Sequence, residues 1–327
     1  MPRILVTPAV YQDGRGPWRD VLDAAKFDVV IPPSDAVAMD AHTLIKHLAG
    51  IDGVLASVEH YTRHVLEASK LRAIARVGVG YDSIDVAAAT ERGVAIAITP
   101  GTNHHSVAEQ AIAMITSIFR DLAGRDHEIR RGVWRRNPVR RLAGNTLGLV
   151  GFGRIGKAIT PRALGLGLKV IAYDPFPDRA FAEKHGVRLV TLEELLPAAD
   201  IVSLHLPCTA ETADIINSAT LTRMKRGAVL INTSRGGLVD EDALLAALTS
   251  GQLSHAGLDV LKVEPPLHDH PLLQLSNVTL APHLGGIDQE ALDAMGVLAA
   301  QCLVDLHRGQ WPEGCIVNDG LKAGWKW

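Results

Sequence analysis

A glycine-rich turn between an apolar run and a helical segment constrains the fold of this chain more than any other feature. The turn, Gly151-Phe152-Gly153-Arg154-Ile155-Gly156, has the pattern G-x-G-x-x-G and directly follows the run Thr146–Val150. The first glycine permits a tight bend, the second lets the backbone approach a pyrophosphate, and the third lets the helix pack closely on the strand. The helix N-terminus adds free N–H groups and a dipole that favours phosphate. The pattern therefore predicts a βαβ unit that binds a dinucleotide through Gly151, Gly153, Arg154, Ile155 and Gly156.

An aspartate at the end of the next apolar run indicates which dinucleotide the turn binds. Asp174 closes the run Lys169–Tyr173, at the place where a carboxylate accepts hydrogen bonds from the adenosine ribose hydroxyls. The same carboxylate would repel a 2′-phosphate, so NAD is the expected cofactor. Arg179 follows a few residues later and leaves NADP open as an alternative.

Short apolar runs alternate with helical segments in both halves of the chain, which is typical of parallel α/β sheets. In the first hundred residues the expected strands are Arg3–Thr7, Asp28–Ile31, Gly53–Ala56, Leu71–Val77 and Val94–Ile98. Further along, the expected strands are Thr146–Val150, Lys169–Tyr173, Ile201–His205, Ala228–Asn232, His255–Val260 and Val278–Ala281. We therefore predict an α/β protein with two doubly wound parallel sheets.

Two long helical segments set the expected domain boundaries. Residues 105–123 form a mostly apolar helix after the first set of strands, and a second helical run extends from Gly286 to about His307. The second run and the tail after it contain no strand candidate, so we expect them to pack back onto the first domain. The expected domains are residues 1–100 plus 287–327, and residues 101–286.

The charge balance argues against nucleic acid as a partner. The chain has 33 Lys+Arg against 36 Asp+Glu, a net charge of −3, and only 4% of its residues are aromatic. Nucleic-acid binding favours a strongly basic surface and, for single strands, stacking aromatics. The basic run between Arg130 and Arg141 is interpreted as a solvated helix end and loop.

The same survey indicates a cytoplasmic protein. No apolar stretch approaches the ~18–20 residues that span a bilayer, and the N-terminus lacks the pattern of a signal peptide. Cys208, Cys302 and Cys315 are odd in number and widely spaced, which fits neither a disulfide framework nor a Cys-x-x-Cys metal site. We expect no membrane segment and no metal.

Four more motifs follow the glycine-rich turn: INTSRGGLVDEDAL (231–244), AGLDVLKVEPP (256–266), DHPLL (269–273) and APHLGG (281–286). Together with GFGRIG they closely resemble the D-isomer-specific 2-hydroxyacid dehydrogenases, which include phosphoglycerate dehydrogenases and glyoxylate/hydroxypyruvate reductases. The resemblance covers roughly residues 70–320. It implies a Rossmann NAD-binding domain inserted in a flavodoxin-like substrate domain. It also implies an oxidoreductase that transfers a hydride between NAD and a D-2-hydroxy acid or 2-keto acid.

The resemblance puts Arg235, Glu264 and His283 at the catalytic positions, and their chemistry suits the reaction. The nicotinamide performs the hydride transfer, so the protein must position the substrate and move one proton. His283 can give or take that proton near neutral pH. Glu264 would orient the imidazole and stabilise its charged form. Arg235 can hold a planar carboxylate with a fork of N–H donors and polarise the carbonyl group.

Other positions are implied to bind substrate or cofactor. The segment Gly78, Val79 and Gly80, within RVGVGYDSID (76–85), would bind the substrate carboxylate through main-chain N–H groups, together with Arg235. Because this loop belongs to the first sheet, the site is expected between the two domains. Further cofactor contacts are expected at Pro207, Thr212, Thr233, Ser234, Asp259, Gly285 and Gly286.

Two histidine groups have simpler interpretations. One group, His268-Asp269-His270, resembles a metal-ligand cluster. Because the equivalent loop of the family is a turn, we predict that these residues form a turn or cap a helix. His104 and His105 lie at the expected hinge before the long helix, where a helix-entry role is at least as plausible as a substrate contact.

Rival functions remain open at this point. The same fold carries dinucleotide-sensing corepressors, which are interaction proteins, although an intact trio argues against a pure scaffold. Formate-oxidising relatives carry Gln where this chain has Glu264, and phosphite-oxidising relatives carry Lys where it has Val79.

The substrate and the assembly are less constrained by the residues. Arg76, Arg135 and Arg136 match basic positions that phosphoglycerate dehydrogenases use near a substrate phosphate, but Ala56 replaces another arginine of those enzymes. Phosphorylated and unphosphorylated substrates therefore both stay open. The helix 105–123 and the arginine-rich segment after it belong to the region through which relatives dimerise, so we predict a homodimer.

Overall fold

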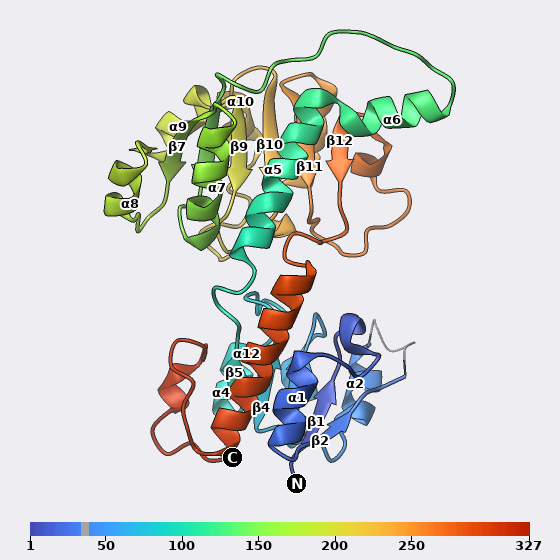
Figure 1. Cartoon of the computed structure of the whole chain (residues 1–327), viewed down its shortest axis with the longest axis vertical. Coiled ribbons are helices and arrows are strands. Elements are labelled where there is room, and N and C mark those ends of the chain that lie inside the picture. The colour runs from blue at the N-terminus through green and yellow to red at the C-terminus, as the bar shows by residue number, and fades with distance from the viewer. Residues whose placement is uncertain (34–38) are drawn as a thin grey trace. The chain divides into compact units, whose positions relative to one another are not determined.

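A computed structural model describes residues 1–33 and 39–327 as two compact units (Figure 1). The first unit combines Met1–Asn103 with Ile287–Trp327, and the second comprises His104–Gly286. Within the described residues, no helix combines the length and the apolar character needed to cross a bilayer.

The first unit is a five-stranded parallel sheet in the order β2-β1-β3-β4-β5. Its strands are β1 (Arg3–Val6), β2 (Asp28–Val30), β3 (Gly53–Ala56), β4 (Ala73–Arg76) and β5 (Ala95–Ala97). Its helices are α1 (Pro17–Ala24), α2 (Ala41–His47), α3 (Arg63–Glu67), α4 (Val86–Glu91) and α12 (Gln289–His307). The strand order 2-1-3-4-5 is the flavodoxin-like order.

Helices cover both faces of this first sheet, which explains why its strands are apolar on both sides. Ile4 and Val6 point into a core that includes α1 and α12, whereas Leu5 points into the opposite core with α2, α3 and α4. The C-terminal helix α12 packs on α1. The expected return of the chain end to the first sheet is therefore present.

The second unit is a seven-stranded parallel sheet in the order β12-β11-β10-β9-β6-β7-β8. Its strands are β6 (Thr146–Val150), β7 (Lys169–Tyr173), β8 (Arg188–Leu189), β9 (Ile201–Leu204), β10 (Ala228–Asn232), β11 (Leu253–Leu258) and β12 (Val278–Leu280). Its helices are α5 (His104–Arg120), α6 (Leu122–Arg130), α7 (Arg154–Gly165), α8 (Arg179–Lys184), α9 (Leu192–Ala198), α10 (Ser218–Arg223) and α11 (Glu241–Thr249). The strand order reverses between β6 and β9, and such a switch point is where doubly wound sheets bind ligands.

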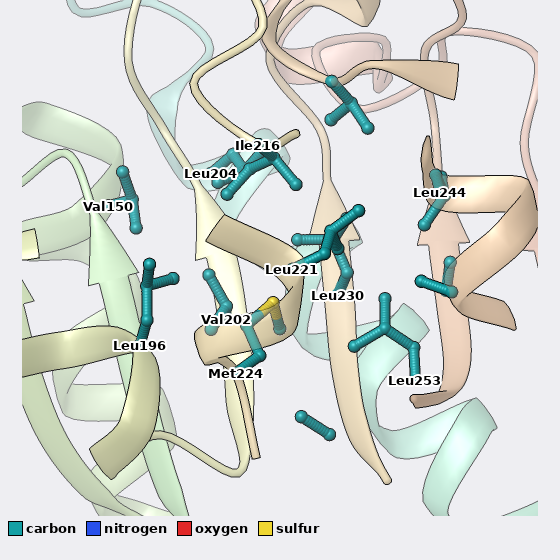
Figure 2. Close-up of a cluster of buried hydrophobic side chains, with 14 of the residues drawn as sticks. Val150, Leu196, Val202, Leu204, Ile216, Leu221, Met224, Leu230, Leu244 and Leu253 are labelled. Atoms are coloured by element: carbon teal, nitrogen blue, oxygen red, sulfur yellow. The ribbon is translucent and has the colours of Figure 1, made fainter. Parts of the chain in front are cut away.

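Two cores sandwich the second sheet. On one face α9, α10 and α11 pack on the strands, and Figure 2 shows Leu196, Leu221 and Met224 directed at strand side chains such as Val202 and Leu230. On the other face α5 and α7 cover a second cluster. The predicted pair of doubly wound parallel sheets is confirmed.

Some predicted boundaries were wrong. The helix expected over residues 105–123 ends at Arg120, because Asp121 adopts a left-handed backbone conformation with φ 48°, and a separate helix α6 follows. Aspartate tolerates that conformation better than most residues. The strand expected over His255–Val260 starts and ends two residues earlier, and the two-residue strand β8 was not predicted.

Candidate active site

The glycine-rich turn leaves β6 and enters α7 with almost no room for side chains. Gly151 has φ 104°, and a Cβ there would lie 2.5 Å from the carbonyl oxygen of His205. A Cβ on Gly156 would lie 2.5 Å from the carbonyl oxygen of Gly151. Gly153 differs, because a Cβ there would meet nothing within 4 Å. Gly153 is the N-cap residue of α7, so the space over the helix N-terminus is open and suits a phosphate group.

Asp174 is attached to this turn by both carboxylate oxygens. Oδ2 accepts a hydrogen bond from the N–H of Phe152 (2.6 Å), and Oδ1 accepts one from the N–H of Phe176 (2.8 Å). An ionised carboxylate has about four acceptor positions, so each oxygen retains capacity for a ribose hydroxyl. This acceptor fits the ribose hydroxyls at the adenosine end of NAD. Arg154 and Ile155 form the first turn of the adjoining helix.

Arg235 follows β10 in a turn that the side chain of Asn232 closes. Asn232 Oδ1 accepts the N–H of Ser234 (3.0 Å), and its Nδ2 donates to the carbonyl oxygen of Arg235 (2.8 Å). The Ser234 hydroxyl donates to the carbonyl oxygen of Leu204 on the neighbouring strand β9 (2.9 Å). The hydroxyl of Thr233 is buried without a hydrogen-bond partner among the described residues. Such an orphaned buried hydroxyl suits a site that a polar cofactor completes.

His283 and Glu264 form a direct pair. Nδ1 of His283 lies 2.7 Å from Oε2 of Glu264, and both side chains remain partly exposed. The other oxygen, Oε1, accepts the N–H of Leu261 (3.0 Å). Because Nδ1 faces the carboxylate, the Nε2 atom of His283 is left to exchange a proton with a ligand.

The backbone around His283 is held in a constrained conformation by Asp259, which follows β11. His283 has φ 56°, in the left-handed region, and its N–H donates to the carbonyl oxygen of Asp259 (2.8 Å). The buried Asp259 carboxylate accepts the N–H groups of Leu284 (2.9 Å) and Gly285 (2.7 Å). Asp259 and Gly285, both expected at the cofactor, thus also shape the loop that carries His283.

The electrostatics of the pair favour an ionised Glu264. Partial burial of this carboxyl opposes its ionisation, but the hydrogen bond and charge of His283 outweigh that effect, with smaller help from the Leu261 N–H and the Arg235 charge. The net result is a lowered pKa for Glu264. A carboxylate that is charged near neutral pH can stabilise an imidazolium beside it.

A cavity of about 380 Å³ opens beside the pair. Asp259, Glu264 and His283 line it together with the apolar residues Leu261, Pro265, Pro266, Leu273, Leu280, Ala281 and Pro282. An apolar wall with a few polar groups is the usual composition of a small-molecule site.

The remaining predicted cofactor positions lie in turns at the same end of the sheet. The Thr212 hydroxyl donates to the carbonyl oxygen of Pro207 (2.7 Å) and accepts the N–H of Thr209 (2.8 Å), so it shapes the loop after β9. Gly286 directly follows the segment that Asp259 holds. These residues therefore lie in loops that follow the carboxyl ends of the strands.

The predicted substrate loop lies in the first unit, directly after β4. Gly78 has φ 144°, and its N–H donates to the hydroxyl of Thr99 (3.0 Å). Of the three predicted donors, Val79 and Gly80 therefore suit an anion better than Gly78. The nearby Arg76 side chain donates from Nη1 to the carbonyl oxygen of Val77 (2.7 Å).

His270 and His105, from the two histidine groups singled out in the sequence, contact other side chains of the second unit. His270 contacts Glu241, with 3.3 Å between Nε2 and Oε2. Within the described ranges, no group of three or more His, Cys, Asp or Glu side chains is arranged to hold a metal ion. His105 lies in the first turn of α5 beside the ring of His104 (4.2 Å between ring centroids) and 3.5 Å from Arg162.

Sequence reasoning missed His205, which directly follows strand β9. Its Nε2 lies 2.8 Å from the hydroxyl of Ser203, and burial of the ring lowers the pKa of His205 to about 3. Its carbonyl group is the one that leaves no room for a side chain at Gly151. The only sequence signal was a histidine within a predicted buried strand.

The fold and site define a class first: a two-unit α/β oxidoreductase with a dinucleotide turn at the switch point of the second sheet. Comparisons with known proteins then give the family. Residues 112–285 match the family described as D-isomer specific 2-hydroxyacid dehydrogenase, NAD binding domain. The chain belongs to the D-isomer specific 2-hydroxyacid dehydrogenases, and NAD is its cofactor.

Three relatives illustrate the extent of the match. The chain is 37% identical to a glyoxylate reductase of Korarchaeum cryptofilum over 330 residues, which covers 98% of both chains. It is 39% identical to a D-3-phosphoglycerate dehydrogenase of Mycobacterium leprae over 306 residues, covering 93% of this chain but 55% of that protein. Its structure matches a D-lactate dehydrogenase of Aquifex aeolicus complexed with NAD and lactic acid, with TM-score 0.84, 27% identity and coverage of 96% and 98%.

Proposed function

We propose that the chain interconverts a short 2-keto acid and its D-2-hydroxy acid, with Arg235, Glu264 and His283 as the catalytic residues. The observation that carries the proposal is the 2.7 Å contact between His283 Nδ1 and Glu264 Oε2 in the sheet that bears the dinucleotide turn. A dinucleotide-sensing corepressor would have no use for this charged acid–base pair, and the relatives above are named as reductases or dehydrogenases.

The chain's own residues divide the work as follows. When bound, the nicotinamide supplies or accepts the hydride. In reduction, His283 donates a proton from Nε2 to the carbonyl oxygen as that oxygen becomes a hydroxyl. Glu264 holds the imidazole by Nδ1 and stabilises its charged form. Arg235 binds the substrate carboxylate with parallel N–H donors. The hydrogen bonds that Asp259 accepts from Leu284 and Gly285 keep the loop that carries His283 in place.

For the substrate, we propose an unphosphorylated acid of the glyoxylate or hydroxypyruvate type. Near full-length similarity to a glyoxylate reductase supports it. The Arg76 guanidinium donates to the carbonyl oxygen of Val77, and Ala56 supplies no second cation nearby. A phosphorylated acid is the second candidate, supported by the identity to a D-3-phosphoglycerate dehydrogenase.

We also propose a cytoplasmic homodimer. The three cysteines are free thiols, as is usual in a reducing compartment. Helix α6 buries none of its side chains, and Leu122 and Ile129 on it are 65% and 55% exposed. A helix with no buried face suits a contact with a second copy of the chain.

The test is the absorbance of NADH during incubation with glyoxylate, hydroxypyruvate, pyruvate and 3-phosphohydroxypyruvate. His283→Asn should lower turnover by about 100-fold or more, because it removes the proton donor, while NADH still binds. His268→Asn, in the exposed loop nearby, is the matched control and should keep normal turnover. Near-normal turnover by His283→Asn would remove the proposed roles of all three catalytic residues. Tight NADH binding without turnover of any acid by the unmodified protein would favour the corepressor-like function.

A further inference from the structure

The segment Lys262–His270, which carries Glu264, is largely exposed, and the carboxylate of Glu241 contacts both of its ends. Lys262, Val263 and Leu267 are exposed in this segment, the last two at 65% and 73%. Glu241, the first residue of α11, accepts the N–H of Lys262 at Oε1 (2.8 Å). Its Oε2 lies 3.3 Å from Nε2 of His270, at the other end of the segment. Glu241 thus contacts both ends of the segment Lys262–His270, which contains Glu264.

The contact between Glu241 and His270 is largely buried, and the loops on either side of it are closely packed. The side chains of Glu241 and His270 are only 17% and 22% exposed. Glu241 lies six residues after Arg235 on the same connection, and the two loops are packed closely, because a Cβ on Gly236 would lie 2.0 Å from the carbonyl carbon of Leu261. The backbone that leads into the Glu264 segment therefore packs against the Arg235 turn and is hydrogen-bonded to the first residue of α11.

A series of hydrogen bonds connects Glu241 to the pair formed by Glu264 and His283. Lys262 is fixed through its N–H, and the preceding residue, Leu261, donates its own N–H to Oε1 of Glu264 (3.0 Å). Oε2 of Glu264 contacts His283. Release of Lys262 and His270 would free the segment to shift, and a displacement near 1 Å is enough to reduce catalysis strongly.

We propose that Glu241 is a positioning residue for proton transfer, with His270 as its second anchor: it keeps Glu264 within hydrogen-bond distance of His283. The inference rests on the proposed role of Glu264 beside His283. The other charges at Glu241 are those of Lys262, whose ammonium pairs with Asp214 (2.7 Å), and of Asp240, the N-cap residue of α11. None of these groups touches the substrate in the proposed mechanism.

Glu241→Gln tests this inference with little change in shape. The amide has one acceptor oxygen where the carboxylate has two, so it cannot accept from both the N–H of Lys262 and an N–H at Nε2 of His270. We expect kcat for 2-keto acid reduction to fall by about 10-fold, with the Kd of NADH unchanged. The high-pH limit of reduction should move to lower pH, as in Glu264→Gln, because His283 loses the carboxylate that favours its charged form. Asp242→Asn, an exposed acid in the same first turn of α11, is the matched control and should change none of these quantities.

A double variant separates positioning from general structural support. If Glu241 acts through Glu264, Glu241→Gln should leave the pH profile of a Glu264→Gln protein unaltered. A wild-type profile in Glu241→Gln, or a further shift in the double variant, overturns the inference while the catalytic trio stands. A wild-type profile in Glu264→Gln overturns the proposed role of Glu264 and this inference with it. Should Glu241→Gln lower the melting temperature markedly, His270→Asn, which removes one anchor and keeps the Glu241 charge, must show the same direction of shift.

Discussion

His283 shows at the scale of one residue how the site is prepared. A left-handed backbone costs a non-glycine residue on the order of 1–3 kcal/mol, and His283 has φ 56°. The hydrogen bonds that Asp259 makes to the segment His283–Gly285 offset this cost. Burying a carboxylate costs free energy unless it is hydrogen-bonded. The same hydrogen bonds therefore also explain why Asp259 is tolerated at 2% exposure.

Asp174 should determine the preference for NADH over NADPH. Asp174→Asn keeps the size of the side chain but removes the charge that repels a 2′-phosphate, so the preference should narrow. Hydrogen bonds to a charged group contribute about 1.5–3 kcal/mol, so NADH affinity should fall by about 10-fold or more. Fluorescence titration with both cofactors measures this. A stronger affinity of the unmodified protein for NADPH would contradict the assignment.

His205 should make the protein less stable in mild acid. Burial holds the pKa of His205 near 3, whereas an unfolded histidine titrates near 6.5. Below about pH 6.5 the unfolded chain therefore gains a proton that the folded chain does not, and stability falls as pH drops towards 3. Above pH 6.5 the residue contributes no pH dependence.

Urea unfolding at pH 7 and pH 5 checks this prediction. His205→Gln keeps a partner for Ser203 and removes the titration, so its stability should fall by less between the two pH values, with a difference of up to about 1.4 kcal/mol per pH unit. His64→Gln, at an exposed position, should behave like the unmodified protein. An equal loss in His205→Gln would mean that other groups cause the acid sensitivity.

At the scale of the β6–α7 element, two glycines of one motif should respond differently to alanine. A Cβ on Gly156 would lie 2.5 Å from a backbone oxygen, so Gly156→Ala should lower stability by about 1–3 kcal/mol. A Cβ on Gly153 meets nothing, so Gly153→Ala should keep the melting temperature but weaken NADH binding at the helix N-terminus. Thermal unfolding with and without NADH distinguishes the two. Unchanged NADH binding by Gly153→Ala would place the phosphates elsewhere.

The elements of both sheets were predictable because parallel strands covered on both faces read as apolar runs. Strand β8 was not, since Arg188 and Leu189 form a two-residue edge strand with little apolar signal. The end of α5 was not either, because Asp121 interrupts the helix through its backbone conformation without a glycine or proline. The sequence motifs were sufficient to select Arg235, Glu264 and His283 as the candidate catalytic residues. The supporting roles of Asn232 and Glu241 depend on partners that folding brings together, and no local pattern reports them.

At the scale of the whole molecule, the end of the chain completes the first unit. Asn318 donates to the carbonyl oxygen of Val94 (2.9 Å) and accepts the N–H of Ile96 (3.0 Å), and Trp325 Nε1 donates to the carbonyl oxygen of Gly93 (2.9 Å). The first unit therefore cannot reach its final packing until the entire second unit has been synthesised. Two stretches far apart in the sequence thus share one core.

The proposed homodimer gives the last prediction. Leu122, Ile129 and Trp134 are 65%, 55% and 78% exposed on and after α6, and burying such side chains contributes about 1.5–3 kcal/mol each. Sedimentation at micromolar concentration should show a dimer. The double variant Leu122→Glu with Ile129→Glu should sediment as a monomer, because two charges would be buried without partners. Val10→Glu, at an apolar position of similar exposure (50%) in the first unit, should leave the dimer intact. A monomeric unmodified protein, or a dimer that survives both glutamates, would exclude this surface as the interface.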